Sequence, residues 1–453
     1  MGYLRESPQV TYWRYVMKRK VALFLACICA SGALYSCGKQ TSTEPKNEES
    51  KEETNKSSED IDTAKADEAN ESISASAPKY AITSVAAEDY EYFTGSIECI
   101  QITDSEHPKL QEAVDDLFSG MVKTFNSSAD SLNEDATEEN KSNKEYANEN
   151  PDIEYYENTY SNNISVEVIR SDAKVFSFIV DDYIYQGGAH GMTGETAYIF
   201  DAATGEQLTL SDFGDEASIK ETAMSYILNT IEQSSQEAKD MLFQDDGVIS
   251  GYENSIKEAF DGEVCPEYYI DNRGVVFLFQ QYEIAPYAAG IISFTVPYSE
   301  IEGFNEAYIP DDEFYSVQLS ELGFNEYIDV DNDGTLDSFH ATTISEDESG
   351  KCKHTIYLND NSSSEEYDGY VYATDYFIHT KTANYILTSA EGEAINLYLV
   401  SDGGLKQIDS IEPAGAIKEI KEDSIVIADR AYDVNGVSWG EEKVVKYSKK
   451  GLE

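Results

Sequence analysis

The sequence is poor in basic residues. Its 453 residues contain 32 Lys and Arg against 87 Asp and Glu, which gives a formal net charge of −55 at pH 7. An electrostatic field of this sign repels phosphate backbones and anionic bilayer surfaces. The composition therefore excludes nucleic acid as a partner and leaves a lipid anchor as the only expected contact with a membrane.

Long apolar runs are scarce as well. Basic Met17-Lys18-Arg19-Lys20 precedes an apolar run from Val21 to Ala33, which is too short to span a bilayer core of ~30 Å. This pattern predicts an export signal over residues 1–36, with Met17 as an alternative start. Leu34-Tyr35-Ser36-Cys37 resembles a bacterial lipobox, in which Cys37 is lipidated and anchors the mature protein outside the cell membrane. An ordinary secretory signal with an incidental Cys37 is the alternative.

Aromatic and branched residues are nearly absent from residues 37–80, where Glu, Lys, Ser, Thr and Asn predominate. Such a segment cannot bury enough surface to fold, so we predict a disordered tether there. Cysteine is also rare beyond Cys37. In an exported protein Cys99 and Cys265 are the favoured disulfide pair, because both fall in the same predicted domain. Other pairings that include Cys352 stay open.

The folded part is rich enough in apolar residues, at 41% of the sequence with 33 Tyr, to form sizeable cores. Residues 81–310 predict an α+β domain in which two helices pack on an antiparallel sheet. The first helix is expected from a cap at Asp104 or Ser105 to about Phe125, followed by a polar loop over residues 126–150 and a strand at Ile153–Tyr156. The second helix is expected over residues 216–239.

Residues 311–453 show short alternating strands and no helical periodicity. They predict a small all-β module, either a meander or a fragment of propeller-like repeats.

Three ordered motifs lie in the first domain: Tyr185–Gly191, Asp201–Phe213, and Tyr282–Gly290 with the strand to Pro297. They resemble the extracytoplasmic domain pair of unassigned function found in the lysozyme-sensing anti-sigma factor RsiV and beside the catalytic domain of peptidoglycan deacetylases. The resemblance covers residues 81–305 and implies an α+β fold outside the membrane. The chain shows no sigma-binding segment, spanning helix or deacetylase catalytic domain, so neither activity is implied.

The first of these motifs carries a candidate ligand site. His190 follows Gly187 and Gly188, which permit a sharp turn or a close approach to a ligand. Tyr185, Tyr282 and Glu283 are its expected neighbours at the lip of a site. The alternative is a turn in which His190 forms only a local hydrogen bond.

Signals of catalysis are missing. The five His residues show no metal-ligand spacing, and the sequence contains neither Gly-x-Ser-x-Gly nor His-Glu-x-x-His. Pairs of carboxylates are too common among 87 acids to single one out. We therefore predict no catalytic residue, and an enzyme is the less favoured class.

A second candidate site lies in the C-terminal part. Asp329, Asp331, Asp333 and Asp337 occupy loop positions 1, 3, 5 and 9, Thr335 offers a carbonyl at position 7, and Gly334 permits the turn. This spacing predicts a Ca²⁺ loop. Position 12 is His340 where a helix-loop-helix calcium site has Glu, and the flanks alternate like strands. The alternative is an acidic hairpin without an ion.

These observations favour an exported surface lipoprotein that binds an envelope-associated ligand, either wall glycan or a cationic protein such as lysozyme, because opposite charge steers association. An envelope-acting hydrolase or transferase and a passive surface spacer are the alternatives. An aromatic groove would favour binding, whereas a polar cleft with perturbed carboxylates would favour an enzyme.

Overall fold

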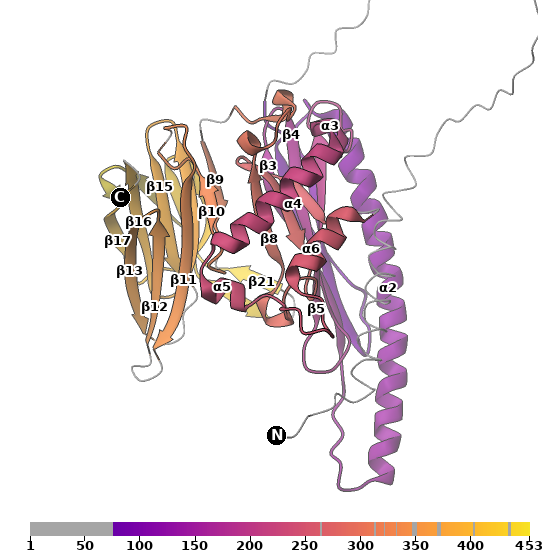
Figure 1. The fold of residues 1–453 in the computed structure, drawn as a ribbon. Coiled ribbons are helices and arrows are strands. Elements are labelled where there is room, and N and C mark those ends of the chain that lie inside the picture. Colours follow the sequence, from indigo (N-terminus) through magenta and orange to yellow (C-terminus); the bar gives the residue numbers. More distant parts are fainter. Residues whose placement is uncertain are drawn as a thin grey trace, which may run out of the picture.

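The computed structural model describes residues 76–262, 265–311, 314–320, 322–331, 333–346, 351–368, 373–401, 404–433 and 436–453. The predicted signal sequence, Cys37 and the predicted tether up to residue 75 lie outside these ranges. Within them, no helix combines the length and the apolar character that crossing a membrane requires. The fold is α+β with a β-rich C-terminal part, as the sequence predicts (Figure 1).

The first layer is a five-stranded sheet in the order β1-β2-β3-β4-β5. Its strands are β1 (Tyr80–Ala86), β2 (Phe93–Ile102), β3 (Tyr160–Ser171), β4 (Val175–Tyr185) and β5 (Met192–Asp201). All neighbours are antiparallel except β2 and β3, which run parallel. A parallel pair needs a crossover connection, and the helix α2 (Pro108–Glu149) provides it.

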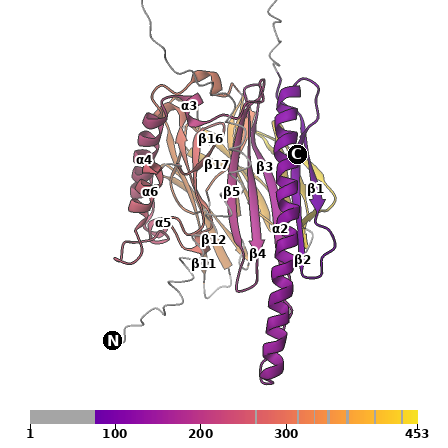
Figure 2. The same ribbon diagram turned by 90° about the vertical axis from the view of Figure 1, so that its right-hand side faces the viewer.

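Helix α2 covers one face of this sheet (Figure 2). Leu110, Val114 and Phe118 recur at helical spacing and are buried against Phe176 and Phe178 of β4. These two strand residues are two positions apart, so they share the face that contacts the helix. The opposite face of β4 carries the intervening residues.

The predicted loop over residues 126–150 is wrong, because α2 continues through it for a total length of 42 residues. The apolar stripe persists there as small residues, with Ala129 and Ala136 buried against Phe93 and Tyr160. The end of the helix extends past the sheet (Figures 1 and 2). The strand predicted at Ile153–Tyr156 is not formed either, and β3 begins only at Tyr160.

The second layer is a three-stranded antiparallel sheet with helices on one face. Its strands are β6 (Glu267–Ile270), β7 (Gly274–Phe279) and β8 (Ile292–Pro297), and the neighbouring helices are α3 (Leu210–Phe213), α4 (Glu216–Gln233), α5 (Gln236–Asp240) and α6 (Tyr252–Asp261). The helix predicted over 216–239 is thus divided after Gln233, where Ser234 leaves the helical conformation. Helix α6 escaped prediction because only Ile256 and Phe260 are buried in it.

The C-terminal part consists of antiparallel sheets. The strands are β9 (Phe314–Gln318), β10 (Glu326–Ile328), β11 (Asp337–Glu346), β12 (Lys351–Leu358), β13 (Asn361–Asp368), β14 (Ala373–Thr380), β15 (Asn384–Ala390), β16 (Ala394–Ser401), β17 (Gly404–Ile411), β18 (Ala416–Lys421), β19 (Ser424–Ala428), β20 (Arg430–Asp433), β21 (Gly436–Trp439), β22 (Lys443–Ser448) and β23 (Gly451–Leu452). The sheets β10-β11-β12-β13 and β14 to β17 are meanders.

The sheet of β14 to β17 and β9 is the middle layer of this part. On one face Phe377 and Ile386 pack with Phe339 of β11. On the other face Ile378 and Leu387 pack with strands β19 and β22. Because it is covered on both faces, β15 is buried along its whole length.

The segment before β10 connects the two parts of the chain. Phe324 enters the core of the second layer and contacts Phe294, with ring centroids 5.3 Å apart. Arg273 forms ion pairs with Asp271 and with Glu326 of β10. The C-terminal sheets lie on the side of the α+β part opposite to α2 (Figure 1).

The predicted disulfide between Cys99 and Cys265 is not formed, and both residues are free thiols. Cys99 lies in the core beneath α2, whereas Cys265 packs against the separate core of the second layer. The assignment of both to one predicted domain overlooked that this domain holds two cores.

Candidate functional site

The two layers of the α+β part meet along the outer edge of β5. From Thr193 to Ala197 none of the described strands pairs with this edge, and side chains of the second layer accept hydrogen bonds from its main-chain N–H groups instead. The donors and acceptors are Thr193 N with Gln281 Oε1 (3.0 Å), Glu195 N with Gln280 Oε1 (3.0 Å) and Ala197 N with Glu267 Oε1 (2.8 Å). We call this contact the seam. At the end of β5, Phe200 forms an isolated bridge with Gln207.

The turn between β4 and β5 lies at one end of the seam. Gly187 and Gly188 have φ angles of +80° and +94°, so the predicted sharp turn is confirmed. The Tyr185 hydroxyl donates to the Gly188 carbonyl at 3.1 Å. Glu139 of α2 and Asn158, which follows the helix, lie near Gly187. The distal half of α2, which the sequence did not predict, therefore lies next to this turn.

His190 leaves this turn and stacks on Tyr287, with ring centroids 3.8 Å apart and an interplanar angle of 22°. Tyr287 belongs to the short 3-10 helix Tyr287–Ala289. The ring of Tyr282 is 6.0 Å from that of Tyr287 and is 43% exposed. We call His190, Tyr282 and Tyr287 the aromatic lip.

Local hydrogen bonds hold the lip in place. Nδ1 of His190 is 2.9 Å from the Gly191 carbonyl oxygen, so the predicted local hydrogen bond coexists with the stacking contact. Tyr282 has a φ of +69°, which is rare for a residue other than glycine. The carboxylate of Glu283 accepts from Gln280 N at 2.8 Å and closes the same turn.

The structure thus places His190 and Tyr282 together, as the sequence predicts, and Glu283 beside them in a turn-closing position. Tyr185 is engaged with Gly188 and has no contact with the lip among the hydrogen bonds and ring contacts of the described residues. The residue that sequence reasoning missed is Tyr287. It lies in the same motif as Tyr282, and an aromatic residue in a turn beside Pro286 was the available signal.

Carboxylates extend from the lip along the face of the first sheet opposite to α2. Asp181 of β4 is directly opposite Glu195 of β5, and Glu167 of β3 is on the same face. Burial, together with repulsion from Asp181 and Glu167, raises the pKa of Glu195 to about 8. Burial also raises the pKa of Asp181, and burial and then repulsion from Asp181 raise that of Glu167.

Two carboxylates of the second layer continue this row toward the lip. Burial raises the pKa of Glu267 to about 6, with a smaller contribution from repulsion by Glu283. Neighbouring groups partly exclude water from the Glu283 carboxylate and so raise its pKa. Much of the Glu283 residue is nevertheless exposed. We call Glu167, Asp181, Glu195, Glu267 and Glu283 the acid strip. The raised pKa values mean that the ionised forms of these carboxyl groups are disfavoured, and a bound cation would favour their ionisation.

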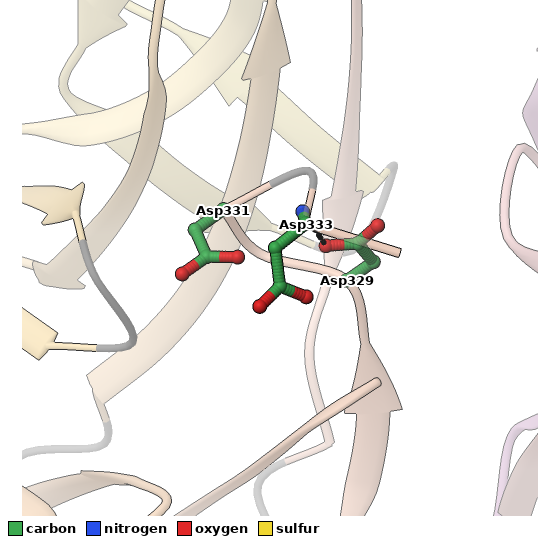
Figure 3. Close-up of side chains that lie close together, drawn as sticks. All are labelled: Asp329, Asp331 and Asp333. Carbon is green, nitrogen blue, oxygen red and sulfur yellow. Dashed lines mark hydrogen bonds between the residues drawn. The ribbon is translucent and has the colours of Figure 1, made fainter. Parts of the chain in front are cut away.

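The second predicted site is the loop between β10 and β11. Oxygens of Asp329, Asp331 and Asp333 lie within 4.8 Å of one another (Figure 3). The carboxylate of Asp329 accepts from Asp333 N and Gly334 N, both at 3.0 Å. These three residues fit a hard cation, which prefers oxygen ligands.

Asp337 does not join this cluster. Its Oδ2 accepts from Val330 N at 3.2 Å and its Oδ1 accepts from the Asn359 amide at 2.6 Å, so hydrogen bonds occupy both oxygens. The oxygens that converge are those of Asp329, Asp331 and Asp333, and the role of Asp337 as a ligand stays a prediction. Thr335 N donates to Asp333 at 2.8 Å, and the role of the Thr335 carbonyl as a ligand stays a prediction.

Family models match two adjacent parts of the chain. The model described as deacetylase PdaC matches residues 86–193, and the model described as a protein of unknown function (DUF3298) matches residues 213–299. The seam separates the two matched regions. The resemblance derived from the motifs is thereby confirmed for this part of the chain, and the two families indicate an extracytoplasmic module associated with the cell envelope.

Solved structures of two DUF3298 family proteins are similar to this chain. The one from Bacteroides fragilis is 18% identical, with a TM-score of 0.40, and the match covers 52% of this chain and 96% of that one. The one from Pseudomonas aeruginosa PAO1 is 16% identical, with a TM-score of 0.33 and the same coverage of 52% and 96%. No curated protein matches the chain.

Proposed function

We propose that the protein is a surface-anchored binding module whose aromatic lip and acid strip take basic side chains of a cationic envelope-associated protein. The observation that carries this proposal is the stacked pair of His190 and Tyr287, with Tyr282 exposed beside it, at the end of a row of carboxylates. The anchor in this proposal is the lipid on Cys37.

The chemistry of this arrangement suits Lys and Arg. A guanidinium or ammonium group is attracted to the face of a tyrosine ring and gains more when it leaves water. The Glu283 carboxylate in the adjacent turn can pair with the same cation. The net charge of −55 would attract a cationic protein over longer distances.

Lysozyme is the probe for a calorimetric titration of the protein at low and at physiological salt. We expect saturable binding under both conditions, because contacts with a desolvated aromatic surface persist when salt screens the long-range field. Binding that is confined to low salt would overturn the proposal, since it would reflect general charge attraction. If wall glycan fragments bind and lysozyme does not, the aromatic lip is a binding site for glycan and the proposed recognition of basic side chains is wrong.

Matched variants locate the binding surface. Tyr287→Ala and Tyr282→Ala should each weaken binding roughly tenfold or more, as is typical of aromatic residues at the centre of an interface. Tyr80→Ala is the control, because Tyr80 is exposed to 40%, similar to Tyr282, but pairs with Ile102 at the other end of the sheet. Equal losses for all three variants would exclude the lip as the site.

One observation favours a second candidate, a hydrolase or transferase that acts on the envelope. Asp181 and Glu195 are neighbours across two strands, and burial raises the pKa of both, which is also a feature of catalytic carboxylates. Release of soluble fragments from purified wall glycan tests this candidate. Glu195→Gln should abolish the release if the pair is catalytic, whereas Tyr80→Ala, at the other end of the sheet, should leave it unchanged.

A further inference from the structure

The Asp loop borders an open cavity of about 690 Å³ in the C-terminal part. Asp331 and Asp333 line it on the loop side, and Asn384 at the start of β15 lines it further in. Lys381 and Lys449 belong to the same lining. No residue of the aromatic lip lines this cavity, so an inference drawn here is independent of the proposed binding of a cationic protein.

The loop backbone presents three carboxylates to one point. Asp329 is fixed by the N–H groups of Asp333 and Gly334, and Gly334 has a φ of +85°, which allows the chain to fold back. The carboxylates of Asp331 and Asp333 lie beside one another as a result (Figure 3). Carboxylates this close repel one another unless a cation lies between them.

Asn384 supplies an independent observation. Its side chain is only 3% exposed, and its amide nitrogen donates at 2.7 Å to the carbonyl of Val330, which lies between Asp329 and Asp331. The Oδ1 atom of Asn384 is buried and makes no well-aligned hydrogen bond among the described residues, although the ring of His379 lies beside the Asn384 side chain. Oδ1 of Asp331 is also buried and makes no well-aligned hydrogen bond among these residues.

Two buried acceptor oxygens on the lining of one cavity are unfavourable as they stand. An unsatisfied buried oxygen is destabilising, and in native proteins such atoms bind an ion or ordered water.

We propose that Asp329, Asp331 and Asp333 hold a Ca²⁺ ion at the edge of this cavity, with Asn384 as a neutral oxygen on its inner side. The donors are all oxygens, which excludes the softer metals that prefer nitrogen and sulfur. Ca²⁺ accepts irregular oxygen shells of six to eight ligands, whereas Mg²⁺ demands a near-octahedral one. The carbonyl of Thr335 is a further ligand, and the remaining positions open to the cavity.

The expected affinity for Ca²⁺ is low, because this loop lacks a ligand that a helix-loop-helix calcium site has. A helix-loop-helix site adds a bidentate Glu at loop position 12. Here that position is His340, whose ring stacks on Tyr357 with centroids 4.4 Å apart. We therefore expect a dissociation constant of about 10⁻⁴ to 10⁻³ M, which is typical of extracellular calcium modules.

Titration of the full-length protein with CaCl₂, followed by calorimetry and by the melting temperature, tests the site. We expect saturable binding of one ion in this affinity range and an increase of the melting temperature on addition of calcium. Asp331→Asn and Asp333→Asn keep the size of the side chain and remove its charge, and each should weaken binding at least tenfold.

Asp360→Asn is the matched control, because Asp360 is an exposed acid of the same β-rich part outside the cluster. It should bind calcium as the unaltered protein does. Circular dichroism without calcium checks that every variant is folded. Equal calcium responses of all three variants would overturn the proposal, because they would show that calcium only screens the acidic surface. Equal affinity for Mg²⁺ would overturn the assignment to calcium.

Discussion

Gln280 and Glu195 exchange two hydrogen bonds across the seam. Oε1 of Gln280 accepts from Glu195 N at 3.0 Å, and Nε2 of Gln280 donates to Glu195 O at 2.9 Å. A single side chain thus occupies the place that a neighbouring strand would take. Such contacts hold β5, most of which lies between the two matched regions, against the second layer, which the DUF3298 model matches.

Replacement of Gln280 should therefore destabilise the protein. Gln280→Ala removes both hydrogen bonds and leaves two half-buried main-chain groups without them, so we expect a loss of about 1–3 kcal/mol in the free energy of unfolding. Urea unfolding measures the loss. Gln111→Ala on the exposed side of α2 is the control, and we expect it to change stability by less than about 0.5 kcal/mol. A loss as small as that of the control would show that the seam contributes no stability.

The pKa of Glu195 predicts a dependence of stability on pH. The folded protein keeps this group protonated up to a pKa of about 8, whereas the unfolded chain releases the proton near the model value of 4.5. The folded state binds more protons between these values, so this group lowers stability as pH rises from 4.5 to 8. The contribution is favourable only while Glu195 remains protonated.

Glu195→Gln mimics the protonated form at every pH. We expect it to increase the free energy of unfolding by roughly 1–3 kcal/mol at pH 9 and to leave it nearly unchanged at pH 4, because one pKa unit corresponds to about 1.4 kcal/mol and Asp181 shares the effect. Urea unfolding at pH values from 4 to 9 measures the difference. Glu221→Gln on exposed α4 is the control. If the free energy of unfolding depends on pH equally with and without Glu195→Gln, the pH dependence does not come from the raised pKa of Glu195.

Asn140 binds α2 to the segment that connects the helix with β3. Its side chain is 2% exposed, and its amide accepts from Asn158 N at 2.8 Å and donates to Asn158 O at 2.7 Å. Asn140→Ala should cost about 1–3 kcal/mol and accelerate hydrogen exchange at residues 150–159. Asn143→Ala, on the exposed surface of the same helix, should leave both quantities unchanged. Unaltered exchange in Asn140→Ala would show that the helix does not hold this segment.

Periodicity predicted those elements that bury large apolar residues at regular spacing. The stripe from Leu110 to Phe125 is of this kind. The second half of α2 escaped because its buried stripe consists mainly of alanine, and burial of alanine leaves little trace in hydropathy. The split of the α+β part into two cores depends on contacts between distant residues, which local patterns do not report.

The candidate sites, too, were predictable only where their residues lie close together in the sequence. The spacing of Asp329, Asp331 and Asp333 along one loop predicted their convergence, because a short loop fixes its own geometry. Spacing could not show that hydrogen bonds from Val330 and Asn359 engage Asp337. The lip needed the tertiary fold as well, since His190 and Tyr287 are far apart in the sequence.

The outer edge of β5 has a consequence for solubility. An unpaired strand edge is a template on which a second chain can add a strand, and this is a common route to aggregation. Here the amides of Thr193, Glu195 and Ala197 are already satisfied by side chains that cannot propagate a sheet. The seam thus joins two folding units and at the same time terminates the sheet, so that the protein needs neither a covering strand nor a helix at this edge to resist intermolecular β-pairing.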